Sequence, residues 1–131
     1  MDFTRRIELD NTYDDAIARV KDALKEQGFG VLTEIDVRQT LKDKLDINVD
    51  AQIILGACNP QLAHRALEID PRVATLLPCN VVVRTENGRT IVEALDPKII
   101  ADVPGNPALV PIAAEAGQRI KAALDALRSA P

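Results

Sequence analysis

Two cysteines and two asparagines are the residues of this chain best suited to chemistry. A Cys-Asn dipeptide occurs twice, at Cys58-Asn59 and at Cys79-Asn80, and each copy lies beside a proline. Thiols and side-chain amides can together hold a small ligand or a soft metal ion. The single histidine, His64, lies between the two copies. These five residues are the candidate ligand-binding residues, and the sequence names no catalytic residue.

The spacing of these residues matches no standard zinc site. Cys58, His64 and Cys79 form the pattern C-x5-H-x14-C, whereas structural zinc sites use closely spaced pairs of ligands. His64 also falls on the polar side of the helix expected after Pro60, opposite an apolar stripe. The favoured function is a small-ligand-binding or metal-binding module near the paired Cys-Asn motifs, but no metal ligand is assigned and the cofactor is unknown.

A thiol-based redox function is the enzymatic alternative. Cys58 directly precedes a helix start, where amide groups and the helix dipole can lower the pKa of a thiol. Cys79 would then have to lie close enough to form a disulfide with it. Alternation along the expected strand turns Cys79 toward the core instead, where free cysteine often serves as a packing residue. A third alternative is a purely structural homodimerisation module, and the sequence does not decide whether the protein is an enzyme.

Local patterns predict the elements around the two dipeptides. Asn59 is a preferred N-cap and Pro60 suits the first helical position, so a helix is expected to start there and to end before Pro71. Residues 81–86 and 89–94 predict a β-hairpin that turns at Asn87-Gly88. In that register Val83 opposes Val92, one face of the hairpin is apolar, and the other is charged.

The remaining segments predict an α+β fold. Strands are expected at residues 3–9, 29–35 and 51–57, and long helices at about 12–27 and 108–128. A surface helix capped by Asp36 follows the second strand. Because the hairpin is antiparallel, we expect a mainly antiparallel sheet with the two long helices on one face. The other face is then left for solvent or a partner.

Composition limits the classes of partner. The 131 residues favour one domain spanning residues 1–131, with 47% hydrophobic residues but only 2% aromatic ones. Few aromatic residues and a net charge of −4 argue against nucleic acid as a partner. The charged start is unlike a signal peptide, and no apolar run is long enough for a membrane. Two cysteines without a CxxC spacing fit the cytoplasm.

One stretch of the chain resembles a known family. The segment Leu55-Gly56-Ala57-Cys58-Asn59-Pro60, together with the later run from Leu76 to Val83, resembles the domain of unknown function 302 family. The similarity continues through Asp96-Pro97 and Asn106-Pro107 into the final helix. The resemblance implies a compact α+β domain similar to the TATA-binding-protein-like arrangement of strand, helix, four strands and helix. It also implies a homodimer and no assigned activity.

Overall fold

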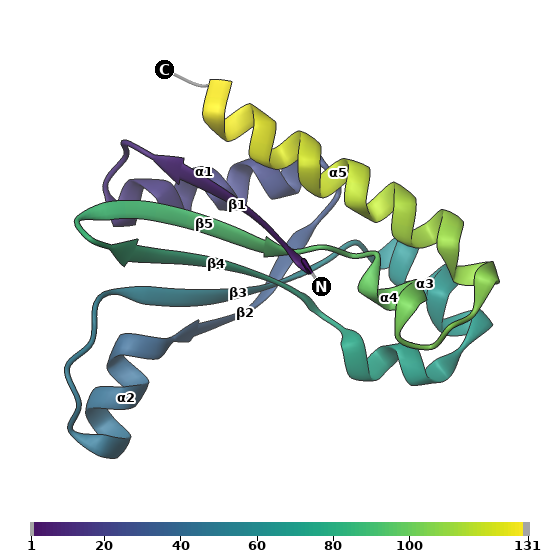
Figure 1. Cartoon of the computed structure of the whole chain (residues 1–131), viewed down its shortest axis with the longest axis horizontal. Coiled ribbons are helices and arrows are strands. Elements are labelled where there is room, and N and C mark those ends of the chain that lie inside the picture. Colours follow the sequence, from purple (N-terminus) through teal and green to yellow (C-terminus); the bar gives the residue numbers. More distant parts are fainter. Residues whose placement is uncertain (1, 130–131) are drawn as a thin grey trace.

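The computed structural model of the protein describes residues 2–129, which form a five-stranded sheet and a layer of helices (Figure 1). All neighbouring strands are antiparallel, in the order β1-β5-β4-β3-β2. The strands are β1 (Thr4–Leu9), β2 (Gly30–Asp36), β3 (Gln52–Cys58), β4 (Cys79–Glu86) and β5 (Arg89–Leu95). The helices are α1 (Tyr13–Glu26), α2 (Val37–Leu45), α3 (Pro60–Ile69), α4 (Ile99–Asp102) and α5 (Val110–Ser129), with short 3₁₀ segments η1 (Pro71–Leu76) and η2 (Pro107–Leu109). The predicted α+β class is confirmed.

The order of elements also agrees with the arrangement that the family resemblance implied. Without the inserted helices α2, α3 and α4, the chain runs strand, helix, four strands and helix. The hairpin has the predicted register, with Val83 opposite Val92. Asn87 and Gly88 both have positive φ, at 51° and 75°, as a two-residue hairpin turn of this kind requires.

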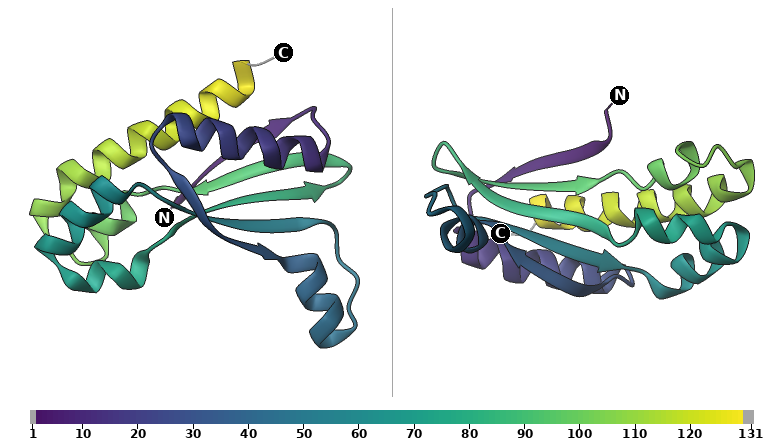
Figure 2. Two further views of the ribbon diagram at one scale, coloured as in Figure 1. Left: turned by 180° about the vertical axis from the view of Figure 1, so that it is seen from behind. Right: turned by 90° about the horizontal axis from the view of Figure 1, so that it is seen from below.

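The two long helices α1 and α5 lie side by side on one face of the sheet (Figure 2). Thr12 begins α1, because its hydroxyl accepts a hydrogen bond from the amide of Asp15 at 3.2 Å. The inward residues of α1 are Ala16, Val20 and Leu24, and all three are buried. They pack with the inward side chains of the strands in a core that is almost wholly aliphatic.

The first half of α5 extends past the sheet and contacts a second group of helices. This group comprises α3 and η1, which connect β3 to β4, and α4, which follows β5 (Figure 1). The two Cys-Asn motifs lie where the sheet meets this second group. No helix within residues 2–129 combines the length and apolar character needed to cross a membrane.

The face of the sheet opposite α1 and α5 carries charged side chains on its strands. Glu93 on β5 accepts hydrogen bonds from the hydroxyl of Thr4 at 2.6 Å and from Arg84 at 2.7 Å. Arg6 on β1 donates to Glu86 on β4 at 3.0 Å. The hydrogen bonds from Thr4 and Arg84 hold the pKa of Glu93 below its ordinary value. The predicted charged face of the hairpin is therefore present.

Helix α2 is the element least integrated into the fold. Asp36 caps it by accepting a hydrogen bond from the amide of Gln39 at 2.9 Å, as predicted. None of its residues is buried, and it projects from the end of the edge strand β2 (Figure 1). Large apolar side chains are exposed on β2, on α2 and just after it: Leu32, Ile35, Leu45 and Ile47.

Gly56 on β3 is required by a close approach of two other segments. A Cβ at this position would lie 2.1 Å from Oγ1 of Thr33 on β2 and 2.8 Å from Cγ of Pro78. The hydroxyl of Thr33 can rotate away, but the ring of Pro78 moves only with its backbone. Gly56 therefore fixes how closely the chain leading into Cys79 packs on the strand leading into Cys58.

We predict that Gly56→Ala destabilises the protein by about 1–3 kcal/mol, the usual cost of overpacking a tight contact. Urea denaturation followed by circular dichroism measures the change. Gly30→Ala is the matched control, because Gly30 is also in the sheet and a Cβ there meets nothing within 4 Å. Equal midpoints for the two variants would contradict the constraint.

Candidate functional site

The two Cys-Asn motifs meet because β3 and β4 are antiparallel neighbours. Cys58 is the last residue of β3, and Cys79 is the first residue of β4. Their register pairs Ala57 with Cys79 and Gly56 with Asn80. Both motifs therefore lie at the same end of the sheet, although 19 residues, 60–78, separate them in the sequence.

Strand alternation then divides the four residues between two faces. Cys79 points toward the helices and is only 5% exposed, as the hairpin parity predicted. Its neighbour Asn80 points to the opposite face and is exposed. The expected convergence of two thiols and two amides is therefore incomplete, because adjacent strand residues cannot share a face. Cys58, Asn59 and Cys79 come together without Asn80.

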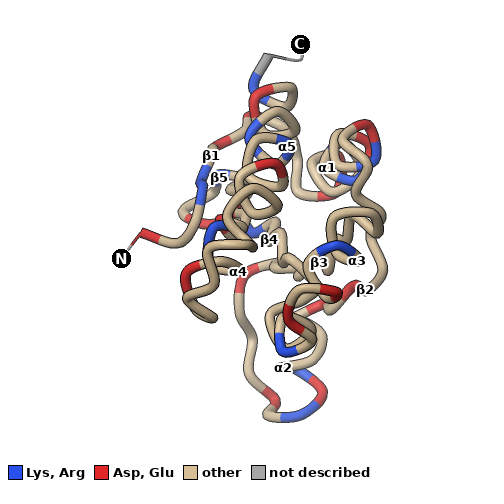
Figure 3. The backbone as a smooth tube through the Cα atoms, turned by 90° about the vertical axis from the view of Figure 1, so that its right-hand side faces the viewer, with Lys and Arg blue, Asp and Glu red and all other residues tan. Residues whose placement is uncertain are grey.

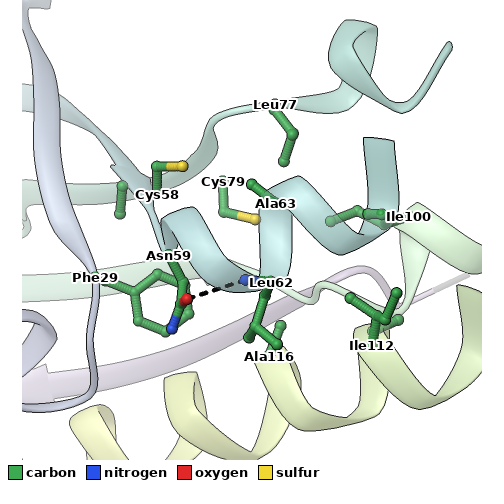
Figure 4. Close-up of a pocket in the computed structure, with 13 residues that line it drawn as sticks. Phe29, Cys58, Asn59, Leu62, Ala63, Leu77, Cys79, Ile100, Ile112 and Ala116 are labelled. Atoms are coloured by element: carbon green, nitrogen blue, oxygen red, sulfur yellow. Dashed lines mark hydrogen bonds between the residues drawn. The ribbon is translucent and has the colours of Figure 1, made fainter. Parts of the chain in front are cut away.

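These three residues border a small cavity between the sheet and the second group of helices (Figure 4). The cavity has a volume of about 30 Å³ and an almost completely apolar surface. Its other walls come from segments across the chain: Phe29, Leu62, Ala63, Ala66, Leu77, Ile100, Ile112, Ala113 and Ala116. A volume above roughly 10–15 Å³ accommodates a water molecule, but an apolar surface gives water few partners. The cavity therefore suits a small apolar group.

Asn59 has a structural role at the edge of the cavity. Its Oδ1 accepts a hydrogen bond from the amide of Leu62 at 3.2 Å, so the predicted N-cap of α3 is confirmed. Asn59 is only 8% exposed, and its Nδ2 lies against Gly28, where a Cβ would come within 3.0 Å. Gly28 has a φ of 83° and follows the end of α1. Asn59 thus joins the start of α3 to the end of α1.

The environment of the two thiols disfavours the thiolate form. Burial, with a smaller contribution from the Cys58 thiol, raises the pKa of Cys79 to about 11. Burial also raises the pKa of Cys58, contrary to the lowering that its place before a helix allowed. The helix start offers Cys58 few donors, because Pro60 has no amide hydrogen and Asn59 already occupies the amide of Leu62. Both thiols are protonated at neutral pH.

His64 does not join the cavity. It lies on the exposed side of α3, where its side chain is 76% exposed and its Nε2 is 3.4 Å from Oε1 of Glu68. The C-x5-H-x14-C pattern therefore does not form one cluster. Among residues 2–129, no group of three or more His, Cys, Asp and Glu side chains is arranged to hold a metal ion.

Sequence patterns missed most of the cavity wall. Ile100 on α4 and Ile112 and Ala116 on α5 face Cys79 and Leu62 across the cavity (Figure 4). They follow Cys79 by more than 20 residues. Their apolar helical stripes predict that they are buried, but not which part of the chain they pack against. The small side chains of Ala113 and Ala116 are the one local signal, since they leave space where larger residues would fill it.

We predict that Cys58 reacts at least about tenfold faster than Cys79 with N-ethylmaleimide in the native protein, because Cys58 is half-buried and Cys79 is buried. Alkylation followed by peptide mapping measures both rates. The Cys58 rate should rise with pH from 7 to 9, since its raised pKa leaves little thiolate at pH 7. Chain unfolded in urea is the control and should label both sites equally. Equal, fast labelling of the native protein would refute the inward placement of Cys79.

Comparison with known proteins places this site in a family. The family model described as domain of unknown function DUF302 matches residues 5–127. The fold is similar to the crystal structure of an uncharacterized conserved protein DUF302 from Bacillus stearothermophilus, with a TM-score of 0.91 and 34% sequence identity. That similarity covers 98% of this chain and 100% of the other. No curated protein matches the chain. The chain belongs to the DUF302 family.

Proposed function

We propose that the protein is a binding module that holds a small, mainly apolar ligand in the cavity beside Cys58, Asn59 and Cys79. The observation that carries the proposal is the position of the cavity, which lies where the two Cys-Asn motifs meet. Ligand sites typically combine an apolar lining with a few polar groups that orient the ligand. Here the two protonated thiols and the amide of Asn59 are those polar groups.

The size of the cavity restricts the ligand. About 30 Å³ admits a methyl, thioether or similar end group rather than a whole metabolite. A longer ligand would have to displace Leu77, the half-buried residue between η1 and β4 that forms one wall. Nδ2 of Asn59 makes no hydrogen bond among the described residues, so it could donate to a carbonyl or hydroxyl group of the ligand.

The thiol-based redox alternative receives less support. Redox-active cysteines need a substantial thiolate fraction, whereas burial raises the pKa of both thiols here. A metal-binding alternative has only the two thiols and Asn59 at the cavity. Both cysteines are free, which fits a reducing compartment, and we propose that the protein acts in the cytoplasm.

The test of the ligand proposal uses xenon, a probe that occupies dry apolar cavities. Methyl NMR spectra recorded at increasing xenon pressure should show saturable shifts for Leu62, Ile112 and Ala116. Ala116→Leu should abolish them by filling the space, and Ala63→Leu provides a second filling variant on α3. Ala126→Leu is the matched control, since Ala126 is exposed on the same helix. The absence of saturable shifts in the unaltered protein would refute the proposal.

We also propose homodimerisation, because a specific surface favours it. The β2/α2 surface comprises Leu32, Ile35, Leu45 and Ile47, with Leu32 and Leu45 exposed by 68% and 61%. The strand β2 is an edge of the sheet, so its outer backbone groups have no strand partner. A second copy related by a two-fold axis would place β2 antiparallel to β2, which continues the pairing found throughout the sheet.

Sedimentation equilibrium tests this second proposal. We expect a mass of twice 14.2 kDa for the unaltered chain. Ile35→Glu and Leu45→Glu should each weaken dimerisation by about tenfold or more, because each buries a charge in the interface. Val103→Glu is the control, since Val103 is equally exposed but lies after α4. A monomer at all concentrations, or equal effects of all three variants, would refute the β2/α2 interface without bearing on the cavity.

A further inference from the structure

We infer that a second groove, formed by β1, α5 and the segment between β5 and α4, binds a small oxyanion. The groove has a volume of about 270 Å³ and is lined by three basic side chains, Arg5, Lys98 and Lys121. It shares the wall residue Ala113 with the cysteine cavity but is lined otherwise by different residues, and the inference does not depend on the proposed ligand there. Three basic residues around one groove are notable in a chain whose net charge is −4.

Arg5 is the side chain that most needs a partner. Alternation places it on the helix-covered face of β1, opposite Ala94 and on the same side as the buried Ile7 and Leu9. Its Nε is buried and has no hydrogen-bond partner among the described residues. Its nearest ionic partner is Oδ2 of Asp96, at 3.6 Å from Nη2, which is too long for a good hydrogen bond. The Arg5 side chain as a whole is 37% exposed, so the outer part of its guanidinium, rather than the buried Nε, can reach an anion in the groove.

The acidic residues nearby neutralise only part of the positive charge. Oδ1 of Asp96 already accepts a hydrogen bond from the backbone amide of Lys98 at 3.0 Å. Lys121 pairs with Asp125, at 2.6 Å from Nζ to Oδ2. The ammonium group of Lys98 has no ion pair within residues 2–129 and is exposed. Arg5 and Lys98 thus line the groove on either side of Asp96, and Arg5 also interacts electrostatically with Asp125.

The floor of the groove is open because α5 presents small residues there. Ala113, Ala114 and Gly117 line it, and a Cβ added to Gly117 would still be 4.0 Å from Oδ1 of Asp96. Gln118 adds a side-chain amide that can donate a hydrogen bond. Figure 3 shows that basic positions occur both on β1 and along the neighbouring helix α5.

The chemistry of these groups selects phosphate or carboxylate oxygens. The planar guanidinium offers paired N–H donors that match either group, and the two ammonium groups add point charges around it. The volume exceeds that of a single phosphate ion, so the oxyanion is expected to be carried on a small organic body. Such a ligand would lie along the face of α5 that carries Ala114, Gly117 and Gln118.

NMR titration of the full chain with inorganic phosphate and, separately, with acetate tests the inference at constant ionic strength. We expect saturable shifts of the Arg5 Nε–H, Gly117 amide and Gln118 side-chain signals with at least one of the two anions. The anion that binds more tightly identifies the group recognised. Linear, unsaturated shifts with both anions up to 50 mM would overturn the inference.

Variants locate the binding site. Lys98→Ala should weaken binding by about tenfold through the loss of a charge-assisted contact, and it should not disturb the fold because Lys98 is exposed. Arg5→Lys should weaken binding by a similar factor by removing the paired donors. Lys44→Ala on the exposed helix α2 is the matched control and should have no effect. An equal loss in Lys44→Ala would show non-specific charge screening and would overturn the site.

Discussion

The antiparallel pairing of β3 with β4 is the constraint on which the rest of the candidate site depends. It places Ala57 opposite Cys79 and so brings two dipeptides from distant segments to one end of the sheet. The same pairing is kept close by Gly56, which leaves room for Pro78. Once the register is set, the alternation of strand side chains decides which residues enter the cavity. Cys79 enters it, and Asn80 is directed away.

Two opposing effects act on the pKa of the Cys58 thiol, and the local structure of the helix start decides which one prevails. A helix start favours a thiolate through its free amides and its dipole, whereas burial favours the neutral thiol. Here the capping arrangement itself removes the first effect. Pro60 lacks an amide hydrogen, and Asn59 uses the amide of Leu62. Burial therefore decides the direction, and the pKa of Cys58 is raised.

The sequence predicted those features that depend on neighbours in the chain. The turn at Asn87-Gly88, the cap at Asn59 and the inward parity of Cys79 each follow from a few adjacent residues, and all three are found. The cavity and the Arg5 groove could not be predicted in this way. Each is completed by α5, and no local pattern states which strand or helix α5 will face. Strand parity turns Arg5 inward on β1, but the groups that it meets there, Asp96 and residues of α5, come from distant parts of the chain.

The position of β1 in the sheet also bears on how the chain folds as it is synthesised. The first strand pairs only with β5, so that Thr4 meets Leu95, while β2 to β5 join neighbours that are closer along the chain. On the ribosome, β1 must therefore remain without this partner until the residues of β5 have emerged. Contacts between distant segments slow folding because a long loop has to close before they form. The sheet, and with it the groove beside Arg5, is thus completed late in the folding of a newly synthesised chain.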